Sequence, residues 1–222
     1  MVNLPDTTLV CVDDIDPCKA IRVLLYCSKD ITFGAIKLFT SHKMENQDDR
    51  VDIVPINHIE TTENYSNFLI RYLPSCITTD YMLIVQRDGF IVNPSAWEDA
   101  FKEYDYIGAP WFVGACAGEG YSSADADNCV GNGGFSLRST ALMRRVQELS
   151  NQYTDKQVHP EDVFICRRTQ RELLREGFTF APPHVAHKFS LENNHLDEKY
   201  SGQFGWHGWR TRDNNPELDC VS

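Results

Sequence analysis

Short apolar runs alternate along the chain with segments whose apolar residues recur at helical spacing. The runs predict strands at residues 7–12, 35–40, 51–56, 81–85, 105–111 and 133–139. The helically spaced segments predict helices at residues 13–30, 62–74, 94–104, 140–150 and 160–177. Alternating strands and helices predict βαβ units, and therefore an α/β fold around a mostly parallel central sheet flanked by helices.

Capping residues support the boundaries of these helices. Asp16 precedes Pro17, and Asn93 precedes Pro94. A side chain that caps the helix, followed by proline at the first helical position, is typical of helix starts. Gly177 ends the last helical segment, which is a common place for glycine.

Length and charge favour one soluble domain. A chain of 222 residues buries roughly 70% of its unfolded surface, which is enough for one substantial core. Its 21 basic and 32 acidic residues give a net charge of -11, which argues against general binding to nucleic acids or anionic membranes. The N-terminus does not read as a signal peptide, and no run reaches the roughly 18 apolar residues of a membrane span. We therefore expect a cytoplasmic protein.

Neither the cysteines nor the irregular segments indicate a second domain. None of the eight cysteines forms a Cys-x-x-Cys pair, so neither a zinc ribbon nor a redox motif is indicated. We expect reduced thiols that mostly fill the core. Residues 112–130 are rich in Gly, Ala, Ser and Asp without any period, which predicts a long loop. Loops of this length are usually functional lids or disordered segments.

Polar residues that could carry chemistry gather in four short islands, at residues 13–14, 86–89, 159–163 and 204–208. The first two follow predicted strands, and ligands in open α/β sheets bind beyond the carboxyl ends of strands. Each island also has a structural explanation. Aspartates initiate turns, acids in a first helical turn stabilise the helix dipole, and a histidine between glycine and tryptophan can simply pack on the surface.

Six sequence motifs, taken in chain order, connect these islands. They are LIVQRDGFIVNPSAW (83–97), YDYIGAPW (104–111), VGNGGFSLRS (130–139), HPEDVFICR (159–167), FAPPHVAHKFSLE (180–192) and FGWHG (204–208). As a set they resemble small GT-A-like glycosyltransferase domains of the DUF5672 type, found in bacteria and large DNA viruses. The likeness runs from about residue 7 to about residue 208. It implies one GT-A domain over residues 1–222, with a nucleotide-binding half (7–110), an acceptor-binding half (111–210) and a polar tail (211–222).

The resemblance implies a divalent metal ion as cofactor. GT-A enzymes carry a short acidic motif after a central strand, usually Asp-x-Asp, whose last carboxylate binds a cation that bridges the donor diphosphate. Here the motif reads Gln86-Arg87-Asp88, so Asp88 is the expected ligand of Mn²⁺ or Mg²⁺, which prefer oxygen ligands. His207 matches the place of a C-terminal histidine ligand. Gln86 departs from the usual acid, which weakens metal binding or frees Gln86 for the donor sugar or ribose; Arg87 pairs with phosphate or forms a structural ion pair.

The resemblance also implies a catalytic base. In similar inverting enzymes, an acid in an EDV-like segment at a helix start takes the proton from the acceptor hydroxyl. Asp162 matches that acid, with Glu161 as the alternative. Such a base has to lie within hydrogen-bond reach of the hydroxyl.

The remaining candidate residues follow from the same resemblance. Glycines in the two Gly-rich motifs would let the backbone approach a ligand closely, although the first motif also fits a β-bulge and Arg71 also fits a solvated side chain. The residues expected to bind the nucleotide sugar are Val12, Asp13, Asp14, Ser66, Asn67, Arg71, Gln86, Arg87, Gly133, Gly134, Gly205 and Gly208. The residues expected to bind the acceptor are Trp111 and Asn132.

The sequence thus predicts a metal-dependent glycosyltransferase that moves a sugar, with inversion, from a nucleotide-sugar donor to a carbohydrate acceptor. A UDP-sugar is the commonest donor for such a fold. Two other classes fit the same residues. In a metal-dependent hydrolase, Asp88, Asp162 and His207 would hold a metal and an activated water. In a catalytically inactive module they would only bind a sugar nucleotide, and Gln86 gives that alternative some weight.

Overall fold

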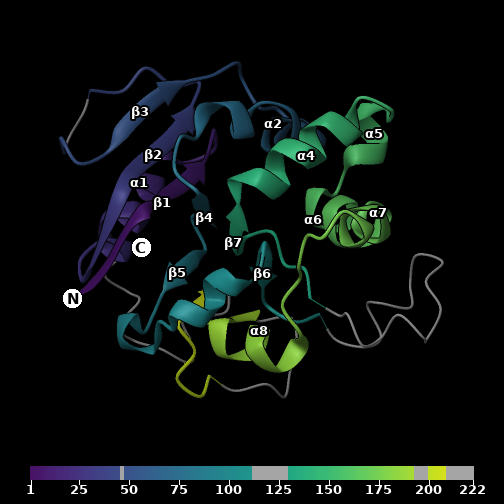
Figure 1. The fold of residues 1–222 in the computed structure, drawn as a ribbon. Helices are drawn as coiled ribbons and strands as arrows, with labels where there is room; N and C mark the ends of the chain where they lie inside the picture. Colours follow the sequence, from purple (N-terminus) through teal and green to yellow (C-terminus); the bar gives the residue numbers. More distant parts are fainter. Residues whose placement is uncertain (46–47, 112–129, 193–199, 209–222) are drawn as a thin grey trace.

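A computed structural model describes residues 1–45, 48–111, 130–192 and 200–208 of the chain. It shows a central sheet with helices on both faces (Figure 1). The α/β fold predicted from the sequence pattern is confirmed. The predicted loop at 112–130 lies outside the described residues except for Val130, and so does the whole predicted tail at 211–222.

The main sheet has the strand order β3-β2-β1-β4-β7-β6. Four neighbouring strands run parallel, namely β3 (Asp52–Pro55), β2 (Ile31–Thr40), β1 (Val2–Val12) and β4 (Tyr81–Val85). β7 (Phe135–Ser139) is antiparallel to both of its neighbours, β4 and β6 (Tyr106–Gly108). The sheet is therefore mostly parallel, as predicted. Because Cys11 pairs with Val85, the residues that follow β1 and β4 meet at one edge of the sheet.

Each face of the sheet is covered by helices, and side chains of a strand alternate between the two faces. In β4, Leu83 and Val85 belong to a core shared with α1 (Pro17–Cys27) and α8 (Pro183–Phe189). Met82 and Ile84 belong to a second core, shared with α2 (Thr62–Arg71) and α4 (Thr140–Ser150). A strand buried on both faces is apolar along its whole length, which explains the continuous run in the sequence.

The predicted helix at 160–177 is interrupted. It forms α6 (Glu161–Val163), a π-helical turn η5 (Phe164–Arg168) and α7 (Gln170–Arg175). Thr169 stabilises the interruption, because both its hydroxyl and its N–H donate to the carbonyl of Phe164. The short helix α5 (Asp155–Val158) precedes this segment.

The predicted helix at 94–104 forms two 3-10 turns instead, η2 (Pro94–Ala96) and η3 (Asp99–Glu103). Trp97 is extended between them and packs its ring against Phe101 and Phe204. Another 3-10 turn, η1 (Leu73–Cys76), follows α2. In the described part of the chain, no helix combines the length and the apolar character that a membrane crossing requires.

A second, small sheet brings the C-terminal motif to the edge where β4 ends. Its strand order is β5-β9-β8, with β5 at Gly89–Ile91, β9 at Gly205–His207 and β8 at Ser190–Glu192. β5 and β9 pair antiparallel, with Gly89 opposite His207. β8 and β9 pair in parallel, with Glu192 opposite His207. Residues more than a hundred positions apart in the sequence thus become neighbours around His207.

Candidate active site

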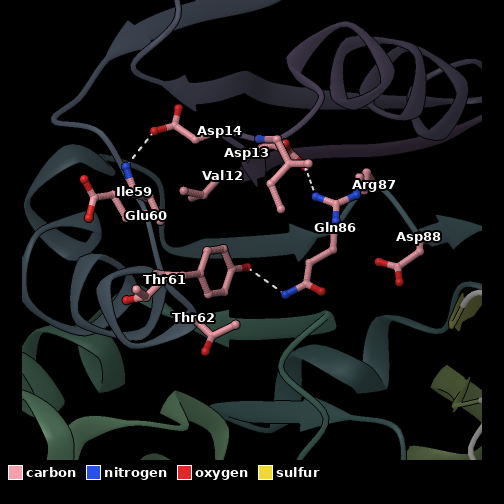
Figure 2. A pocket seen from close by; sticks show the side chains of 12 residues that line it. Val12, Asp13, Asp14, Ile59, Glu60, Thr61, Thr62, Gln86, Arg87 and Asp88 are labelled. Atoms are coloured by element: carbon pink, nitrogen blue, oxygen red, sulfur yellow. Dashed lines mark hydrogen bonds and ion pairs between the residues drawn. The ribbon is translucent and has the colours of Figure 1, made fainter.

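Two adjoining cavities open where β1 and β4 end. The first, of about 270 Å³, lies between the loop after β1, the start of α2 and the turn after β4 (Figure 2); we call it the strand-end cavity. The second, of about 210 Å³, lies between residues 132–134, the start of α6 and β9; we call it the glycine-turn cavity. Thr62, Tyr65 and Gln86 line both, so the two cavities form one continuous site.

The turn after β4 explains why an apolar strand ends in polar residues. Gly89 N–H donates to the carbonyl of Gln86 at 2.9 Å, and Gln86 N–H donates to the carbonyl of Gly134 at 3.0 Å. A Cβ at Gly89 would lie 2.6 Å from that Gly134 oxygen, so only glycine lets the backbone approach so closely. The turn holds Asp88 at the wall of the strand-end cavity.

Asp88 and His207 face each other at the junction of the two cavities. Asp88 Oδ1 lies 3.7 Å from His207 Nε2, and Gln86 Oε1 lies 3.3 Å from the same nitrogen. The other ring nitrogen, Nδ1, lies 3.5 Å from Glu192 Oε1. Burial disfavours a charged ring, but the carboxylates of Glu192 and Asp88 outweigh burial and raise the pKa of His207 above its ordinary value.

The chemistry of these groups fits a divalent cation. Carboxylate and amide oxygens are ligands that Mn²⁺ and Mg²⁺ accept. A carboxylate beside the second ring nitrogen, here that of Glu192, is the usual partner of a metal-bound histidine. Within the described ranges, no group of three or more His, Cys, Asp or Glu side chains forms a metal site on its own. Asp88 and His207 are side chains at the junction that could contribute to a cation site.

Asp13 and Arg87 form the wall of the strand-end cavity beside β1. Asp13 Oδ1 accepts hydrogen bonds from the N–H groups of Ile15 and Asp16, both at 2.7 Å. Asp13 Oδ2 lies 3.1 Å from Arg87 Nη1 (Figure 2). The Arg87 side chain is 37% exposed, so it has an ion-pair partner in the protein and remains accessible from the cavity. Val12 lines the same cavity.

Asp14 links three segments of the chain. Its Oδ1 accepts hydrogen bonds from the Thr40 hydroxyl and the Ser41 N–H. Its Oδ2 accepts one from the Ile59 N–H (Figure 2). Its side chain is 1% exposed. Burial alone would raise the pKa of Asp14, but the N–H groups of Ser41 and Ile59 lower it to about 2. Asp14 thus lies at the cavity wall, and both oxygens of its carboxylate accept hydrogen bonds from the protein.

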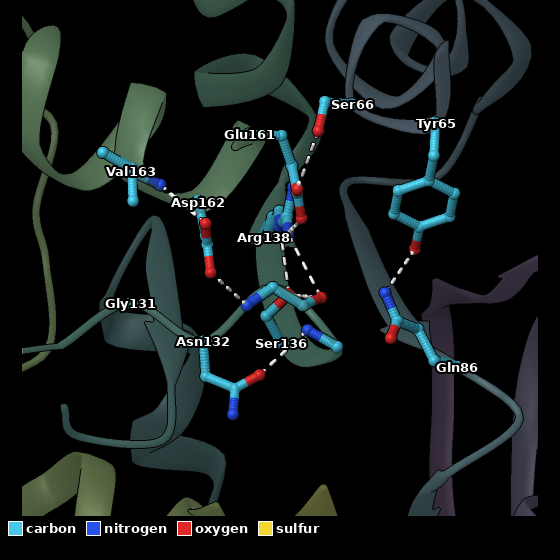
Figure 3. A network of polar contacts seen from close by, with 12 residues as sticks. Tyr65, Ser66, Gln86, Gly131, Asn132, Ser136, Arg138, Glu161, Asp162 and Val163 are labelled. Carbon is cyan, nitrogen blue, oxygen red and sulfur yellow. Dashed lines mark hydrogen bonds and ion pairs between the residues drawn. The ribbon is translucent and has the colours of Figure 1, made fainter. Parts of the chain in front are cut away.

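The glycine turn at residues 131–134 lies against α6 and β9. Gly133 N–H donates to Asp162 Oδ2 at 3.1 Å (Figure 3). A Cβ at Gly133 would overlap the carboxylate of Glu161, and a Cβ at Gly134 would overlap the imidazole of His207. Both glycines are therefore required by the close approach of polar side chains rather than by a β-bulge.

Glu161 and Arg138 form a buried ion pair behind this turn. Arg138 Nη2 lies 3.4 Å from Glu161 Oε1 and donates to the carbonyl of Gly133 at 3.3 Å. The Ser66 hydroxyl donates to Glu161 Oε2 at 3.4 Å (Figure 3). Arg138 is fully buried, and Glu161 is 6% exposed. Charges buried to this extent persist only when they are paired.

Asp162 lines the glycine-turn cavity beside Glu161. Its oxygens accept hydrogen bonds from the N–H groups of Gly133 at 3.1 Å and Val163 at 2.7 Å. Burial and the adjacent charge of Glu161 raise the pKa of Asp162 well above the ordinary carboxyl range, although Arg138 and the two N–H groups oppose the shift. A carboxylate with a raised pKa is suited to accept a proton.

The two residues expected to bind an acceptor differ in position. Asn132 lines the glycine-turn cavity; its Oδ1 accepts from Gly134 N–H at 2.9 Å, and its buried Nδ2 has no hydrogen-bond partner among the described residues. Trp111 packs against Gly131, where a Cβ would overlap the indole, and Arg167 lies over its ring at 4.8 Å. Trp111 therefore packs against the glycine turn at Gly131.

Several residues expected to bind the nucleotide sugar line neither cavity. Asn67 Nδ2 donates to the Asp155 carbonyl and Arg71 Nη2 to the Tyr153 carbonyl, so both residues tie α2 to the segment before α6. These contacts give both residues a structural role, and their contact with the nucleotide sugar stays a prediction.

The two C-terminal glycines also have structural roles, and their contact with the nucleotide sugar stays a prediction. A Cβ at Gly205 would overlap the ring of Phe135 in the core. Gly208 N–H donates to the carbonyl of Asp88 at 3.0 Å, and Gly208 has a φ of 129°, which favours glycine. Ser66, by contrast, lines the glycine-turn cavity.

Sequence reasoning did not identify Tyr65, Arg138 and Glu192 as site residues. The hydroxyl of Tyr65 accepts from Gln86 Nε2 at 2.9 Å, and the ring lines both cavities. Arg138 and Glu192 are charged residues within otherwise uncharged strands. A charge inside a buried strand was the signal that could have identified them, because buried charges are rare unless paired.

A sequence comparison identifies the family. Residues 49–207 match the family DUF5672, described as a protein of unknown function. The chain belongs to the DUF5672 family. The matched range contains Asp88, Asp162 and His207 together with the glycine turn. It begins after β1, so the loop that carries Asp13 and Asp14 lies outside it.

Solved glycosyltransferases show a weaker likeness to this DUF5672 chain. The galactosyltransferase LgtC, in complex with donor and acceptor sugar analogues, is 11% identical with a TM-score of 0.49 over 96% of this chain and 94% of its own. A glycosyltransferase involved in glycosylation of the major capsid of PBCV-1 is 13% identical with a TM-score of 0.48 over 96% and 98%. A mannosyltransferase from Pyrobaculum calidifontis, in complex with GDP-Man and Mn²⁺, is 10% identical with a TM-score of 0.42 over 64% and 48%. No curated protein matches the sequence.

Proposed function

We propose that this DUF5672 protein is a GT-A-type glycosyltransferase that moves a sugar from a nucleotide-sugar donor to a carbohydrate acceptor. One observation carries the proposal. Asp88 lines the strand-end cavity and His207 lines the glycine-turn cavity, and their side chains lie 3.7 Å apart at the junction. A metal-competent pair is thus flanked by a cavity for a nucleoside on one side and by a buried carboxylate, Asp162, on the other.

The strand-end cavity is the proposed nucleoside site. Its walls combine the apolar side chains of Ile15 and Ile59 with the ring of Tyr65, and mostly apolar walls with a few polar groups are typical of small-molecule sites. All its lining residues belong to segment 7–110, which supports assigning nucleotide binding to that half. Arg87 offers a positive charge for phosphate. The likeness to GT-A enzymes makes a UDP-sugar the first donor to test.

Asp88 and His207 are the proposed ligands of Mn²⁺ or Mg²⁺, with Gln86 beside them. The ion would neutralise charge on the departing nucleoside diphosphate. Glu192, at 3.5 Å from His207 Nδ1, would hold the ring so that Nε2 faces Asp88. Gln86 replaces the usual acid, and its Oε1 lies 3.3 Å from His207 Nε2. The replacement therefore lowers the negative charge of the site but keeps an oxygen that could bind the ion.

Asp162 is the proposed general base for inverting transfer. The N–H groups of Gly133 and Val163 fix its carboxylate, and each oxygen keeps a lone pair for the acceptor hydroxyl. The hydroxyl loses its proton to Asp162 as it attacks the anomeric carbon from the side opposite the diphosphate. Asn132 Nδ2 is a donor for a sugar hydroxyl in the same cavity. Segment 111–210 supplies these groups, and we assign acceptor binding to it.

The direct test is a transfer assay with the purified protein, a panel of nucleotide sugars and carbohydrate acceptors, and Mn²⁺. A transferase releases nucleoside diphosphate faster when acceptor is present and forms a new glycosidic bond that mass spectrometry detects. Release of free sugar without acceptor would instead establish a hydrolase. Nucleotide binding without turnover of any donor would establish a binding module.

A further inference from the structure

The adjacent carboxylates at the start of α6 have different surroundings. Glu161 faces inward, with Arg138 Nη2 at 3.4 Å from one oxygen and the Ser66 hydroxyl at 3.4 Å from the other. His159 Nδ1 lies 2.9 Å from that hydroxyl. Asp162 receives two backbone N–H groups and no side-chain cation within ion-pair distance among the described residues. The two acids are therefore not interchangeable.

Arg138 is an unusual residue in its position. It lies in the buried strand β7 with no exposed surface, its Nε donates to the Ser136 hydroxyl at 2.9 Å, and its guanidinium lies over the ring of Tyr106 at 5.2 Å. Burying a guanidinium destabilises a protein unless the charge is paired. The ion pair with Glu161 reduces that destabilisation. Arg138 also donates to the carbonyl of Gly133, so the pair has a contact beyond its own charges.

Gly133 connects the ion pair to Asp162. Its carbonyl accepts from Arg138 at 3.3 Å, and its N–H donates to Asp162 at 3.1 Å. The absence of a Cβ lets the Glu161 carboxylate lie directly against the same residue. The Ser136 hydroxyl, which accepts from Arg138 Nε, also donates to the Gly133 carbonyl at 3.3 Å. Side chains tied to Arg138 and Asp162 thus hold both polar groups of Gly133.

We propose that Glu161 and Arg138 are positioning residues, a buried ion pair that fixes Gly133 and, through it, the carboxylate of Asp162. The inference rests on the proposed function, in which Asp162 is the base. It removes Glu161 as the alternative base, because both of its oxygens are held by Ser66 and Arg138. Glu161 also has an electrostatic effect, because its negative charge lies beside Asp162 and disfavours the ionised form of that carboxyl.

The groups that face Asp162 define this electrostatic effect. Arg138 from β7 and His207 from β9 are cations or titrate to cations, whereas burial raises the pKa of Tyr106 and of Cys166 and keeps both neutral. Glu161 is the adjacent anion. Removing its charge takes away a repulsion and leaves Arg138 uncompensated, and both changes favour the ionised form of Asp162.

The test is the titration of the Asp162 carboxyl carbon by ¹³C NMR in the wild type and in Glu161→Gln, with Asp162→Asn to assign the signal. We expect the midpoint to fall by about one pH unit in Glu161→Gln. The acid limb of the profile of kcat/KM against pH should shift in the same direction. An unchanged or higher midpoint would overturn the proposal, and so would loss of transfer at every pH while Asp162 is still ionised, because that result would make Glu161 the base.

Two further measurements make the outcome decisive. Glu172→Gln removes an acid that is 50% exposed on α7 and should leave the midpoint unchanged. If Glu161→Gln does not fold, Glu161→Asp decides: the shorter side chain withdraws the carboxylate from Gly133, so the Asp162 midpoint should move, and a midpoint equal to that of the wild type would contradict us. The NMR experiment does not depend on enzymatic activity, so its result holds even if no transfer is detected. If transfer is detected but the Asp162 midpoint does not shift, the positioning role is rejected while the proposed function is retained.

Discussion

The two cavities contain the same chemical group, a carboxyl, with pKa values shifted in opposite directions. In the strand-end cavity, hydrogen bonds from Ser41 and Ile59 outweigh burial and lower the pKa of Asp14 to about 2. In the glycine-turn cavity, burial and the neighbouring Glu161 raise the pKa of Asp162. Since both are aspartates, the difference comes from their surroundings alone. A carboxylate surrounded by donors stabilises the fold, whereas a buried one beside another anion is ready to take a proton.

The sharpest test of this contrast is Asp162→Asn. An amide cannot accept the proton, so we expect transfer to fall by about 10²–10⁴-fold. Nucleotide binding should stay unchanged, because Asp162 lines only the glycine-turn cavity. In the wild type the rate should rise with pH through the raised pKa of Asp162, since only the ionised form acts as base. Steady-state kinetics against pH measure both, and full activity of the variant would exclude Asp162 as the base.

The next effect concerns the junction between the cavities. Asp88→Ala and His207→Ala each remove one of the proposed metal ligands. A ligand at 100 times its dissociation constant stabilises a protein by about 2.7 kcal/mol, and we expect this metal-dependent stabilisation by nucleotide to disappear in both variants. Thermal shifts with and without Mn²⁺ measure it. Glu98→Ala, which removes an acid that is 47% exposed and pairs with Lys188, is the control; metal-dependent shifts retained in Asp88→Ala would refute the assignment.

A smaller effect should appear in stability when Asp14 is changed to Asn. Losing hydrogen bonds to a buried charge should lower the free energy of unfolding by about 1–3 kcal/mol. The pKa of Asp14 is depressed in the folded state, so its contribution is complete above about pH 4, the range of an unfolded aspartate. It is lost as the pH falls toward about 2.

Urea unfolding at several pH values measures this effect of Asp14→Asn. The difference from the wild type should be constant near neutrality and shrink below about pH 4. Asp52→Asn, at a side chain that is 61% exposed and pairs with Lys37, should cost less than about 1 kcal/mol. A pH-independent loss in Asp14→Asn would mean that the ionised carboxylate is not what stabilises the loop.

The smallest effect is expected for Arg71→Ala. Its guanidinium donates to Asn67 and to the Tyr153 carbonyl, so stability should fall by about 0.5–1.5 kcal/mol. Nucleotide affinity should not change, because Arg71 lines neither cavity. Calorimetric titration with the nucleotide measures this affinity, and a marked loss of affinity would restore the ligand contact that the sequence predicted.

The sequence predicts the strands of the main sheet well, but it misses the three short strands of the small sheet and predicts some helices poorly, for physical reasons. β4 is apolar throughout because both its faces are buried. Its apolar residues are consecutive in the sequence, so the strand can be recognised from that segment alone. The break at Thr169 depends on a side-chain hydrogen bond that competes with the helix. The extended backbone at Trp97 depends on contacts with Phe204, which lies far along the chain. Such tertiary contacts leave no periodic signal in the sequence.

The site is predictable in its residues and not in its arrangement. Asp88, Asp162 and His207 follow from motifs, but their proximity depends on the pairing of β5 with β9 and on the glycine turn. Asn67 and Arg71 have residue types that suit phosphate or sugar, and only the structure reveals that they face the Tyr153 region. Arg138 was read as part of an ordinary strand, because burial of a charge is a property of the fold.

The central claim is that the Asp88–His207 pair joins a nucleoside site to a catalytic carboxylate. Calorimetric titration of the protein with nucleoside diphosphates, each with and without Mn²⁺, tests it most directly. We predict that one nucleotide binds only when the metal is present and that Asp88→Ala abolishes this binding while Asp162→Asn preserves it. Binding of equal strength without metal, or no binding of any nucleoside diphosphate, would contradict the account.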